Sequence, residues 1–398
     1  MNCKQRIGER IYWTSVNDRR KQLFENIWPL PNGVSYNSYL IRDEKCALMD
    51  TVESGSDRSY ADWVSESLDG RPLDYLIIHH MELDHSGEIE NLVQRYPDVK
   101  IVGNCKTFRV LEAYFGKRDN LIEVKDGDTL SLGYHNLKFV FTPWVHWPET
   151  MMTFDETDGI LFSGDGFGCF GTVDGGFLDT RINVDKYWGE MVRYYSNIVG
   201  KYGSPVQKAL QKLGGLPITT ICSTHGPVWT ENISRVIGIY DRLSRYDADE
   251  GVVIVYGSMY GNTEQMAEAI AAELSAQGIR NIVMHNVTKS HPSYILADIF
   301  RYKGLIVGSP TYSNQIFPEV EALLSKILLR EVKGRYLGYF GSFAWAGAAV
   351  KRLAEFAEKS KFELIGDPVE MKQAMKDLTY TQCENLARAM ADRLKKDR

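Results

Sequence analysis

The sequence HHMELDHSGE (residues 79–88) decides how the first half of this chain is interpreted. It follows LDYLII (73–78), an apolar run typical of a buried strand, and it places three histidines and three acids within ten positions. His80, Glu82 and Asp84 stand two residues apart, so a strand end or extended loop projects their side chains the same way. Imidazole and carboxylate groups gathered where a strand ends predict a metal site.

Three later strand ends add ligands of the same kind. His146 lies in TPWVHWPET, Asp165 in LFSGDGF and His225 in CSTHGP, each where a strand runs into a loop. Seven nitrogen and oxygen ligands from four loops are too many for one ion, whereas a dinuclear centre with one bridging carboxylate uses them all. The candidate ligands are His80, Glu82, Asp84, His85, His146, Asp165 and His225.

The alternative is that these side chains are ordinary polar residues of exposed loops. For any one of them that interpretation is reasonable, but four of the chain's eight histidines fall into the pattern. His79 is expected to support a ligand through a hydrogen bond. We expect His135, His285 and His291 to have no role in metal binding.

The bulk composition limits the class of protein. A chain of 398 residues exceeds one ordinary core, so two domains are expected. Its net charge of −6 gives no basic patch for nucleic acid or an anionic membrane, and no apolar run suits a signal or a spanning helix. We therefore expect a cytoplasmic protein. Its six cysteines form no CxxC pair, so a redox centre must use other ligands.

The two halves of the chain differ in their pattern of strands and helices. Up to about residue 245, short apolar strands follow one another with helices between some of them, which predicts a layered α/β fold. After RYDADEG, strands and helices alternate regularly, which predicts a doubly wound parallel sheet. We expect domains over residues 1–249 and 250–398.

The second half carries a candidate phosphate site in YGSMYGNTEQMA (256–267), which runs from a strand into a helix. Backbone amides of the loop, its hydroxyl groups and the helix N-terminus together form an anion cradle that suits a monophosphate. The loop is neither GxGxxG nor GK[ST], which disfavours a dinucleotide and a P-loop. Taken alone, this loop could instead be an ordinary glycine-containing turn that binds no ligand.

Two further loops follow strands of the same predicted sheet: GSPTYSNQIFP (308–318) and GSFAWAGAA (341–349). Tyr312, Phe343 and Trp345 can flank a flat ring, while Ser309 and neighbouring polar groups can bind its edge. Such aromatic residues could also fill a core, but their position in glycine-rich loops favours a ligand site.

The ligand order H-x-E-x-D-H followed by His146, Asp165 and His225 resembles the metallo-β-lactamase fold and, more narrowly, the flavodiiron proteins. Hydrolases of that superfamily generally have a histidine where this chain has Glu82, and they bind zinc. A carboxylate makes the site harder and favours iron. The resemblance implies one iron held by His80, Glu82, His146 and Asp165, and another held by Asp84, His85, Asp165 and His225. Asp165 would bridge the two, and the counterpart of His85 can be displaced by water in some members.

The second half resembles flavodoxin, and its three loops match the phosphate loop and the two isoalloxazine loops of that family. FMN is the implied cofactor. Tyr260 stands where many flavodoxins have threonine, as is common among flavodiiron proteins. The expected FMN-binding residues are Ser258, Met259, Tyr260, Gly261, Asn262, Thr263, Pro310, Thr311, Tyr312, Asn314, Ser342, Phe343, Ala344, Trp345 and Gly347.

Together these resemblances predict an α/β chain with an N-terminal metallo-β-lactamase-like αββα sandwich followed by a flavodoxin-like doubly wound parallel sheet. The implied activity is reduction of dioxygen to water, of nitric oxide to nitrous oxide, or both, at a non-haem diiron site supplied with electrons through FMN. One alternative is a dizinc hydrolase with a flavodoxin-like regulatory domain. Another is an electron-transfer module with a degenerate metal site.

The resemblance also implies partners and a proton donor. Since there is no CxxC pair and no further domain after MADRLKKDR, electrons are expected from separate rubredoxin or a reduced deazaflavin. A head-to-tail homodimer or a dimer of dimers is typical of the family. Within MVRYYSNIVGKYG, Tyr194 or Tyr195 is a candidate proton donor, and Tyr195 is our choice. Some members carry a histidine where this chain has FENIW (24–28), which leaves the choice of gas open.

Overall fold

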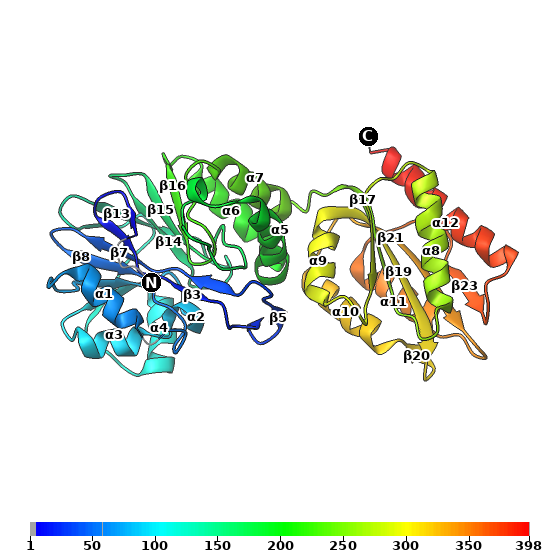
Figure 1. Cartoon of the computed structure of the whole chain (residues 1–398), viewed down its shortest axis with the longest axis horizontal. Helices are drawn as coiled ribbons and strands as arrows, with labels where there is room; N and C mark the ends of the chain where they lie inside the picture. Colours follow the sequence, from blue (N-terminus) through cyan, green and yellow to red (C-terminus); the bar gives the residue numbers. More distant parts are fainter. Residues whose placement is uncertain (1–4, 58, 398) are drawn as a thin grey trace. The chain divides into compact units, whose positions relative to one another are not determined.

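The computed structural model describes residues 5–57 and 59–397, which form two compact units (Figure 1). One unit comprises the chain up to Tyr195 together with Tyr202–Asp241, and the other comprises Ser196–Lys201 and the chain from Arg242 onward. The domain boundary that we predict at residues 249 and 250 lies at the start of strand β17 (Asp249–Tyr256). Within the described residues, no helix combines the length and the apolar composition that a membrane span requires.

Two large sheets form the described part of the first unit, together with two small strand pairs. The larger has the order β1-β2-β7-β8-β9-β10-β11 and the smaller the order β12-β13-β14-β15-β16. The strands of the larger sheet are β1 (Arg6–Ile7), β2 (Ile11–Trp13), β7 (Tyr39–Arg42), β8 (Cys46–Met49), β9 (Tyr75–Ile77), β10 (Lys100–Gly103) and β11 (Leu121–Glu123). Those of the smaller sheet are β12 (Thr129–Ser131), β13 (Asn136–Phe141), β14 (Met151–Asp155), β15 (Ile160–Gly164) and β16 (Thr220–Ser223).

Helices flank these two sheets, as Figure 1 shows with α1, α3 and α4 beside the larger sheet and α6 and α7 beside the smaller. The helices are α1 (Tyr60–Leu68), α2 (Leu83–Ser86), α3 (Ile89–Arg95), α4 (Cys105–Phe115), α5 (Asp185–Tyr194), α6 (Gly203–Leu213) and α7 (Ile233–Ser244). Two small hairpins pair β3 (Val16–Asp18) with β6 (Val34–Tyr36) and β4 (Leu23–Phe24) with β5 (Trp28–Pro29). Every residue of β14 and β15 is buried, as expected for strands at the centre of a layered core.

The sequence predicts one strand over SYNSYLI (35–41), but the structure has two strands there, β6 and β7. The interruption lies at Asn37, whose buried side chain donates hydrogen bonds to the carbonyls of Ser223 and Gly226 at 2.9 and 2.8 Å. It also accepts one from Trp13 Nε1 at 3.0 Å. These contacts satisfy a buried amide, and the chain leaves one sheet at this point.

The second unit is a parallel sheet of order β18-β17-β19-β21-β22, with β23 also pairing with β21. Its strands are β17 (Asp249–Tyr256), β18 (Ile282–Asn286), β19 (Tyr302–Tyr312), β20 (Gln315–Ile316), β21 (Tyr336–Phe343), β22 (Glu363–Leu364) and β23 (Val369–Lys372). This is the strand order of a doubly wound flavodoxin-like sheet. Ligands of such sheets bind at the carboxyl ends of the strands, where the strand order reverses.

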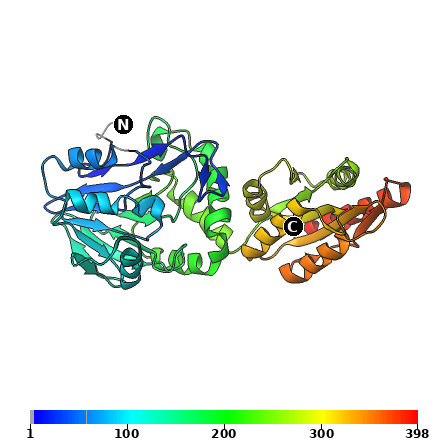
Figure 2. The same cartoon turned by 90° about the horizontal axis from the view of Figure 1, so that it is seen from below.

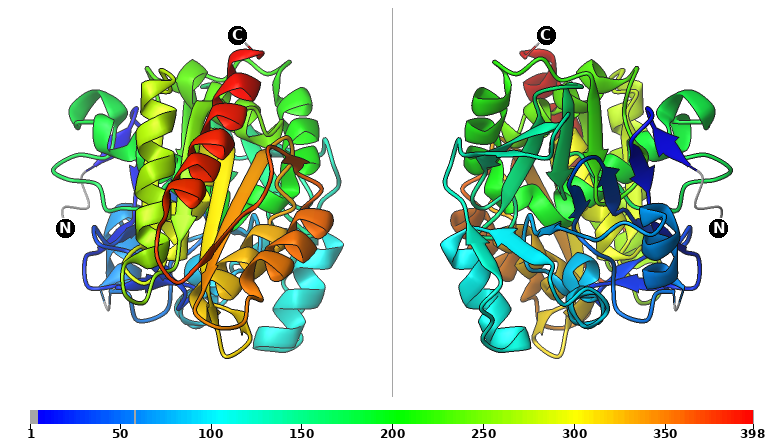
Figure 3. Two further views of the ribbon diagram at one scale, coloured as in Figure 1. Left: turned by 90° about the vertical axis from the view of Figure 1, so that its right-hand side faces the viewer. Right: turned by 90° about the vertical axis from the view of Figure 1, so that its left-hand side faces the viewer.

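Five helices cover the two faces of this sheet. They are α8 (Asn262–Ala276), α9 (Pro292–Arg301), α10 (Pro318–Leu329), α11 (Ala349–Ser360) and α12 (Asp377–Lys395). Helices α8 and α12 lie side by side on one face, which is turned to the viewer in the left panel of Figure 3, and Figure 2 shows the sheet edge-on. Met266, Ile270 and Leu274 of α8 are fully buried in the core beneath, at the four-residue spacing that places side chains on one face of a helix.

Candidate metal centre and flavin pocket

The seven candidate ligands come from four strand ends of the first unit. His80 and Glu82 follow β9, His146 lies between β13 and β14, and Asp165 and His225 follow β15 and β16. The four histidines and Asp165 are buried. The structure therefore brings together side chains from both sheets of the unit, which are separated by up to 145 positions in the sequence (His80 to His225).

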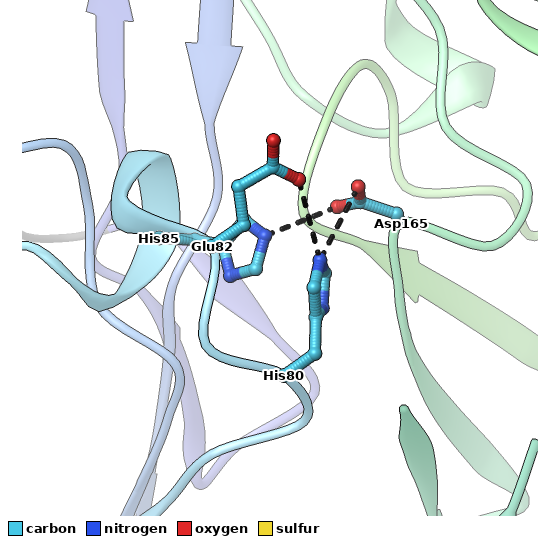
Figure 4. Close-up of side chains that lie close together, drawn as sticks. All are labelled: His80, Glu82, His85 and Asp165. Carbon is cyan, nitrogen blue, oxygen red and sulfur yellow. Dashed lines mark ion pairs between the residues drawn. The ribbon is translucent and has the colours of Figure 1, made fainter. Parts of the chain in front are cut away.

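One group of ligands surrounds Oδ2 of Asp165. His146 Nε2 lies 3.0 Å from this oxygen and 2.9 Å from Glu82 Oε2. His80 Nε2 lies 3.5 Å from Asp165 Oδ2 and 3.6 Å from Glu82 Oε2. Figure 4 shows His80, Glu82 and Asp165 pointing toward one another, together with His85. This is the set that the resemblance assigns to the first iron.

A second group surrounds the other oxygen of the same carboxylate. His85 Nε2 lies 3.4 Å from Asp165 Oδ1 and 3.3 Å from Asp84 Oδ1. His225 Nε2 lies 3.4 Å from Asp165 Oδ1 and 3.1 Å from Asp84 Oδ2. Each oxygen of Asp165 thus faces a different pair of histidines, which is the geometry required of a bridging carboxylate.

Asp84 and His85 reach this position by a local structure that the sequence does not predict. An extended segment would direct neighbouring side chains to opposite sides. Instead, Glu82 is extended (ψ 136°) and precedes the short helix α2, which carries both Asp84 and His85. The helical turn lets two adjacent residues contribute to the same group, so the alternation argument holds for His80 and Glu82 only.

The ligand atoms are suited to metal binding because they are buried and most of them form no hydrogen bond. Among the described residues, buried side-chain atoms without a hydrogen-bond partner include His80 Nε2, Glu82 Oε2, both carboxylate oxygens of Asp84, His85 Nε2 and His225 Nε2. Leaving such atoms unpaired costs roughly 1–3 kcal/mol each. Within each of two groups, His80–Glu82–His85–Asp165 and Asp84–His85–His225, the possible ligand atoms lie within 4.8 Å of one another. The residues therefore fit a two-metal centre.

Close packing of acids and imidazoles shifts the pKa values of the ligands. Burial alone would lower the pKa of His80, but the carboxylates of Asp165 and Glu82 raise it to about 10. The same opposition raises the pKa of His225 to about 10, through Asp165 and Asp84. Burial would raise the pKa of Asp165, yet the surrounding histidines hold it well below its usual value. The metal-free cluster is thus an ion-pair network.

Hydrogen bonds around the ligands fix their orientation. His225 Nδ1 lies 2.9 Å from the carbonyl of Ser35, which leaves Nε2 as the ligand atom. Thr224 Oγ1 donates to Asp165 Oδ1 at 2.6 Å. We predict His79 to be a supporting residue, and its Nδ1 lies 2.5 Å from Asp50 Oδ2. This contact fixes the position of the chain next to His80.

Two buried tyrosines, Tyr194 and Tyr195, lie near the end of α5, and Tyr194 packs against the metal ligand His225. The ring of Tyr194 lies 5.6 Å from that of His225, and its hydroxyl has no hydrogen-bond partner among the described residues. Burial and the charge of Asp165 raise the pKa of Tyr194 well above its usual value. The ring of Tyr195 instead packs edge-on against Tyr240 at 5.1 Å.

Glu25, in the FENIW segment, is a further acid near the site that the sequence did not single out. It lies in the turn between β4 and β5, and Trp28 Nε1 donates to its Oε2 at 2.9 Å. Burial of its carboxyl and the neighbouring charge of Glu82 raise the pKa of Glu25 to about 7. The effect of Glu82 on the carboxyl group of Glu25 depends on how close the two lie in the folded protein, so the sequence alone could not single out Glu25.

The second unit has a cavity of about 570 Å³ at the carboxyl ends of its strands. The predicted residues that line it are Met259, Tyr260, Asn262, Pro310, Thr311, Tyr312, Asn314, Ser342, Phe343, Ala344 and Trp345. Tyr260 and Trp345 are 90% and 87% exposed, so both rings are free to cover a flat ligand. All three loops predicted from the sequence thus meet at one cavity.

Four predicted residues are not among those that line the cavity: Ser258, Gly261, Thr263 and Gly347. Ser258 Oγ accepts a hydrogen bond from the amide of Gly261 at 3.1 Å. Gly261 has a φ of 88°, in the left-handed region that glycine adopts without strain, and it directly precedes α8. Thr263 Oγ1 lies 2.9 Å from Ser342 Oγ and so joins two of the loops.

The lining also includes three residues that the sequence analysis missed, Ser313, Ala346 and Gln373. Ser313 and Ala346 lie within the predicted loops, but Gln373 follows β23. Its backbone amide donates to the carbonyl of Phe343 at 2.8 Å. The only available signal for Gln373 was its place after a strand, and that short strand has no apolar run.

Comparisons with known proteins match both units of the chain. Residues 34–226 match the family described as "ODP family beta lactamase", and residues 254–386 match "Flavodoxin". The anaerobic nitric oxide reductase flavorubredoxin of Escherichia coli O1:K1 is 32% identical over 364 residues, which cover 90% of this chain and 76% of that protein. The structure of rubredoxin oxygen:oxidoreductase from Desulfovibrio gigas has a TM-score of 0.94 at 30% identity, covering 98% of each chain. The flavodiiron protein from Giardia intestinalis has a TM-score of 0.89 at 26% identity, covering 97% of this chain and 96% of that one.

The fold and the two sites define an oxidoreductase built from a metallo-β-lactamase-like domain and a flavodoxin-like domain. The chain belongs to the flavodiiron protein family. The predicted fold class and family are therefore confirmed. This family implies a diiron centre, and the flavodoxin domain implies FMN.

We expect metal binding to the metal-free protein to release protons. At pH 7, His80 and His225 carry protons because their pKa values are about 10, and an incoming ion must displace them. Raising the pH toward 10 removes these competing protons, so metal affinity should rise. Calorimetric titration with ferrous iron under anaerobic conditions, in two buffers of different ionisation enthalpy, measures the protons released. No release at pH 7 would show that both imidazoles are already neutral.

The same shifts predict the pH dependence of stability in the metal-free protein. The pKa values of His80 and His225 are raised from 6.5 to about 10 on folding, so their ion pairs stabilise the folded state fully below about pH 6.5. This contribution should be lost as the pH rises through 10. Urea unfolding of the metal-free protein from pH 7 to 10 measures it, and the iron-loaded protein, in which ligands hold metal instead of protons, is the control.

Proposed function

We propose that this protein reduces dioxygen to water, nitric oxide to nitrous oxide, or both, using electrons relayed through FMN from an external donor. The observation that carries the proposal is the position of Asp165 between two groups of histidine and carboxylate ligands. The cavity in the flavodoxin-like unit supports the second cofactor.

We assign one iron to His80, Glu82 and His146, the other to Asp84, His85 and His225, and Asp165 to both. Three carboxylates and four imidazoles make a site hard enough for iron. When bound, the two irons supply one-electron redox chemistry and open positions for a small diatomic molecule, and FMN exchanges one or two electrons. The protein's part is to hold these groups, to exclude bulk water and to supply protons.

Proton supply is assigned to Tyr194 rather than to our sequence-based choice, Tyr195. The Tyr194 ring faces His225, its hydroxyl is free to donate, and its raised pKa keeps it protonated. The Tyr195 ring packs against Tyr240 of α7. Glu25, with a pKa of about 7, is a second group able to hold a proton beside Glu82 near neutral pH.

The alternative of a dizinc hydrolase is less well supported. A carboxylate at position 82 favours iron over zinc, and a flavin pocket serves no hydrolytic step. Relatives that match most of the chain carry the names of a nitric oxide reductase and an oxygen oxidoreductase. Both names describe redox enzymes, in agreement with the proposal.

We further propose that electrons come from rubredoxin or a reduced deazaflavin and that the protein works as a head-to-tail homodimer or a dimer of dimers. Rubredoxin appears in the name of the Desulfovibrio gigas protein. Around the flavin pocket, Met259, Tyr260, Tyr312 and Trp345 are exposed, which gives a protein partner an apolar surface to contact. Rubredoxin-dependent gas consumption and the mass of the protein in solution test these two proposals.

The activity itself is tested by anaerobic steady-state assays with one artificial reductant and either dioxygen or nitric oxide as the acceptor. We expect the iron- and FMN-loaded protein to consume at least one of the gases. The ratio of the two rates establishes the preferred substrate. A protein that carried two zinc ions per chain, consumed neither gas and hydrolysed esters or thioesters would support the hydrolase alternative instead.

The metal assignment is tested with Asp165→Ala. This change removes the group shared by both irons, so we expect much of the iron to be lost while FMN stays bound in the other unit. Thr224→Val is the matched control because it removes the hydrogen bond to Asp165 without removing a ligand. Iron and flavin are measured by elemental analysis and by the flavin absorption. Loss of FMN with full retention of iron would contradict the assignment.

The proton donor is tested by comparing Tyr194→Phe with Tyr195→Phe. Both changes delete one buried hydroxyl on neighbouring residues, so they are closely matched. We expect Tyr194→Phe to lower turnover by about 10²-fold or more, with iron and FMN contents unchanged, since a positioned general acid contributes at least that much. Tyr195→Phe should have little effect. The opposite ranking of the two variants would return the role to Tyr195.

The flavin assignment is tested with Asn262→Asp, which puts a negative charge at the start of α8 where the phosphate is expected. Repulsion should weaken FMN binding about tenfold or more. The control is Ser275→Asp, which places the same charge at the exposed far end of the same helix. Titration of the flavin-free protein with FMN, followed by flavin fluorescence, gives both affinities. Equal affinities for the two variants would rule out a phosphate at the α8 N-terminus.

A further inference from the structure

A second group of metal-type ligands lies at the other end of the smaller sheet, away from the seven ligands. His135 directly precedes β13, Asp155 is the last residue of β14, and Asp158 lies in the turn that joins β14 to β15. His146 and Asp165 lie at the opposite ends of these same strands. The group is therefore separate from the diiron ligands, although it is part of the same sheet.

The three side chains converge on one point. Their possible ligand atoms lie within 4.8 Å of one another, and His135 Nε2 is 3.5 Å from Asp158 Oδ2. His135 and Asp155 are 1% and 0% exposed, whereas Asp158 is exposed. Two ligands are thus held rigidly inside the protein, and the third faces solvent, from which an ion can enter.

The orientation of His135 is fixed by a carboxylate on its other side. His135 Nδ1 lies 2.9 Å from Asp43 Oδ2, and the same oxygen accepts the backbone amides of Tyr134 and His135 at 2.8 and 2.7 Å. The contact of Nδ1 with Asp43 turns Nε2 toward Asp155 and Asp158. Within the part of the chain that the structure describes, Nε2 has no hydrogen-bond partner. A carboxylate–histidine pair of this kind is a common support for a metal-binding imidazole.

The charges near this group are not balanced by protein cations. Asp43 forms an ion pair with Arg10 at 3.0 Å. Over residues 5–57 and 59–397, no lysine or arginine forms an ion pair with Asp155 or Asp158. The oxygens of Asp155 accept the backbone amides of Thr157 and Asp158 at 3.1 and 3.3 Å, but each carboxylate oxygen can accept more than one such bond. The two carboxylates thus bring negative charge to the group that a bound divalent cation would offset.

We propose that His135, Asp155 and Asp158 form a third metal site, which binds a divalent transition-metal ion such as Zn²⁺. One imidazole and two carboxylates are a ligand set that zinc accepts, and the exposed side leaves a position for water. The ion would tie the start of β13 to the β14–β15 turn and so stabilise the sheet. The competing explanation is that His135 is protonated and bridges Asp43 and Asp158 without any metal.

Zinc chloride is the probe for this site, added to the full-length protein already loaded with iron and FMN. Iron occupies the seven-ligand centre in this form, so that zinc is available to other sites. We expect one tightly bound zinc per chain by elemental analysis after gel filtration, with two irons retained. Calorimetric titration gives the affinity, and the thermal midpoint should rise with zinc because the ion binds the folded state only.

Asp158→Asn is the main variant, because the exposed position tolerates it and the change removes only a charge. Glu156→Gln is the matched control: it removes a carboxylate from the same turn, but Glu156 contacts Asn136 and Lys138 rather than the cluster. We expect Asp158→Asn to weaken zinc binding about 10- to 100-fold or more. Glu156→Gln should bind zinc as the unchanged protein does, and both variants should keep their iron, FMN and gas consumption.

His135→Asn gives a second, independent test. It should abolish the zinc-dependent rise in the thermal midpoint, even if its midpoint without zinc is lower than that of the unchanged protein. The proposal is overturned if the iron-loaded protein binds no zinc, or if Asp158→Asn and Glu156→Gln bind it equally. A loss of stability in Asp158→Asn that is independent of zinc, with no zinc bound by the unchanged protein, would identify His135 as a bridging imidazolium.

Discussion

The candidate metal centre of the first unit depends on one carboxylate, that of Asp165. Its oxygens lie 3.0–3.5 Å from one ring nitrogen in each of four histidines. Asp165 meets His80 and His146 with one oxygen and His85 and His225 with the other. Burying such a group alone would be costly, because a desolvated charge requires several partners. The four imidazoles stabilise the carboxylate, and it in turn holds them at a common distance.

The two sheets of the first unit make this arrangement possible. β9 of the larger sheet delivers His80 and the segment up to His85, while β15 and β16 of the smaller sheet deliver Asp165 and His225. Neither sheet alone contributes ligands to all sides of the site. Backbone hydrogen bonds fix where each strand ends, so small changes in the loops leave the ligand positions largely intact. The centre is therefore a property of the packed sandwich rather than of any one motif.

Much of this could be predicted from the sequence, and the failures have physical causes. The gathering of the seven candidate ligands was predictable because they stand at strand ends, and the meeting of the three loops at one cavity because parallel strands end at one edge of a sheet. The position of Asp84 and His85 on α2 was not, since a short helical turn leaves no periodicity in four residues. The choice between Tyr194 and Tyr195 depends on which side chain the end of α5 directs toward the candidate ligands. Two consecutive tyrosines in the sequence do not reveal this. Gln373 reaches the flavin pocket only through the fold.

The length of the connecting loops explains why the two ends of the smaller sheet differ. At one end, residues 142–150 form a long loop between β13 and β14, which carries His146 inward to meet ligands from the other sheet. At the other end, β14 and β15 are joined by a tight turn that contains Asp158 and keeps it at the surface. A tight turn cannot extend over a second sheet, so ligands placed on it gather a few side chains at most. Long loops permit a buried centre with many ligands, and short turns permit only a small site open to water.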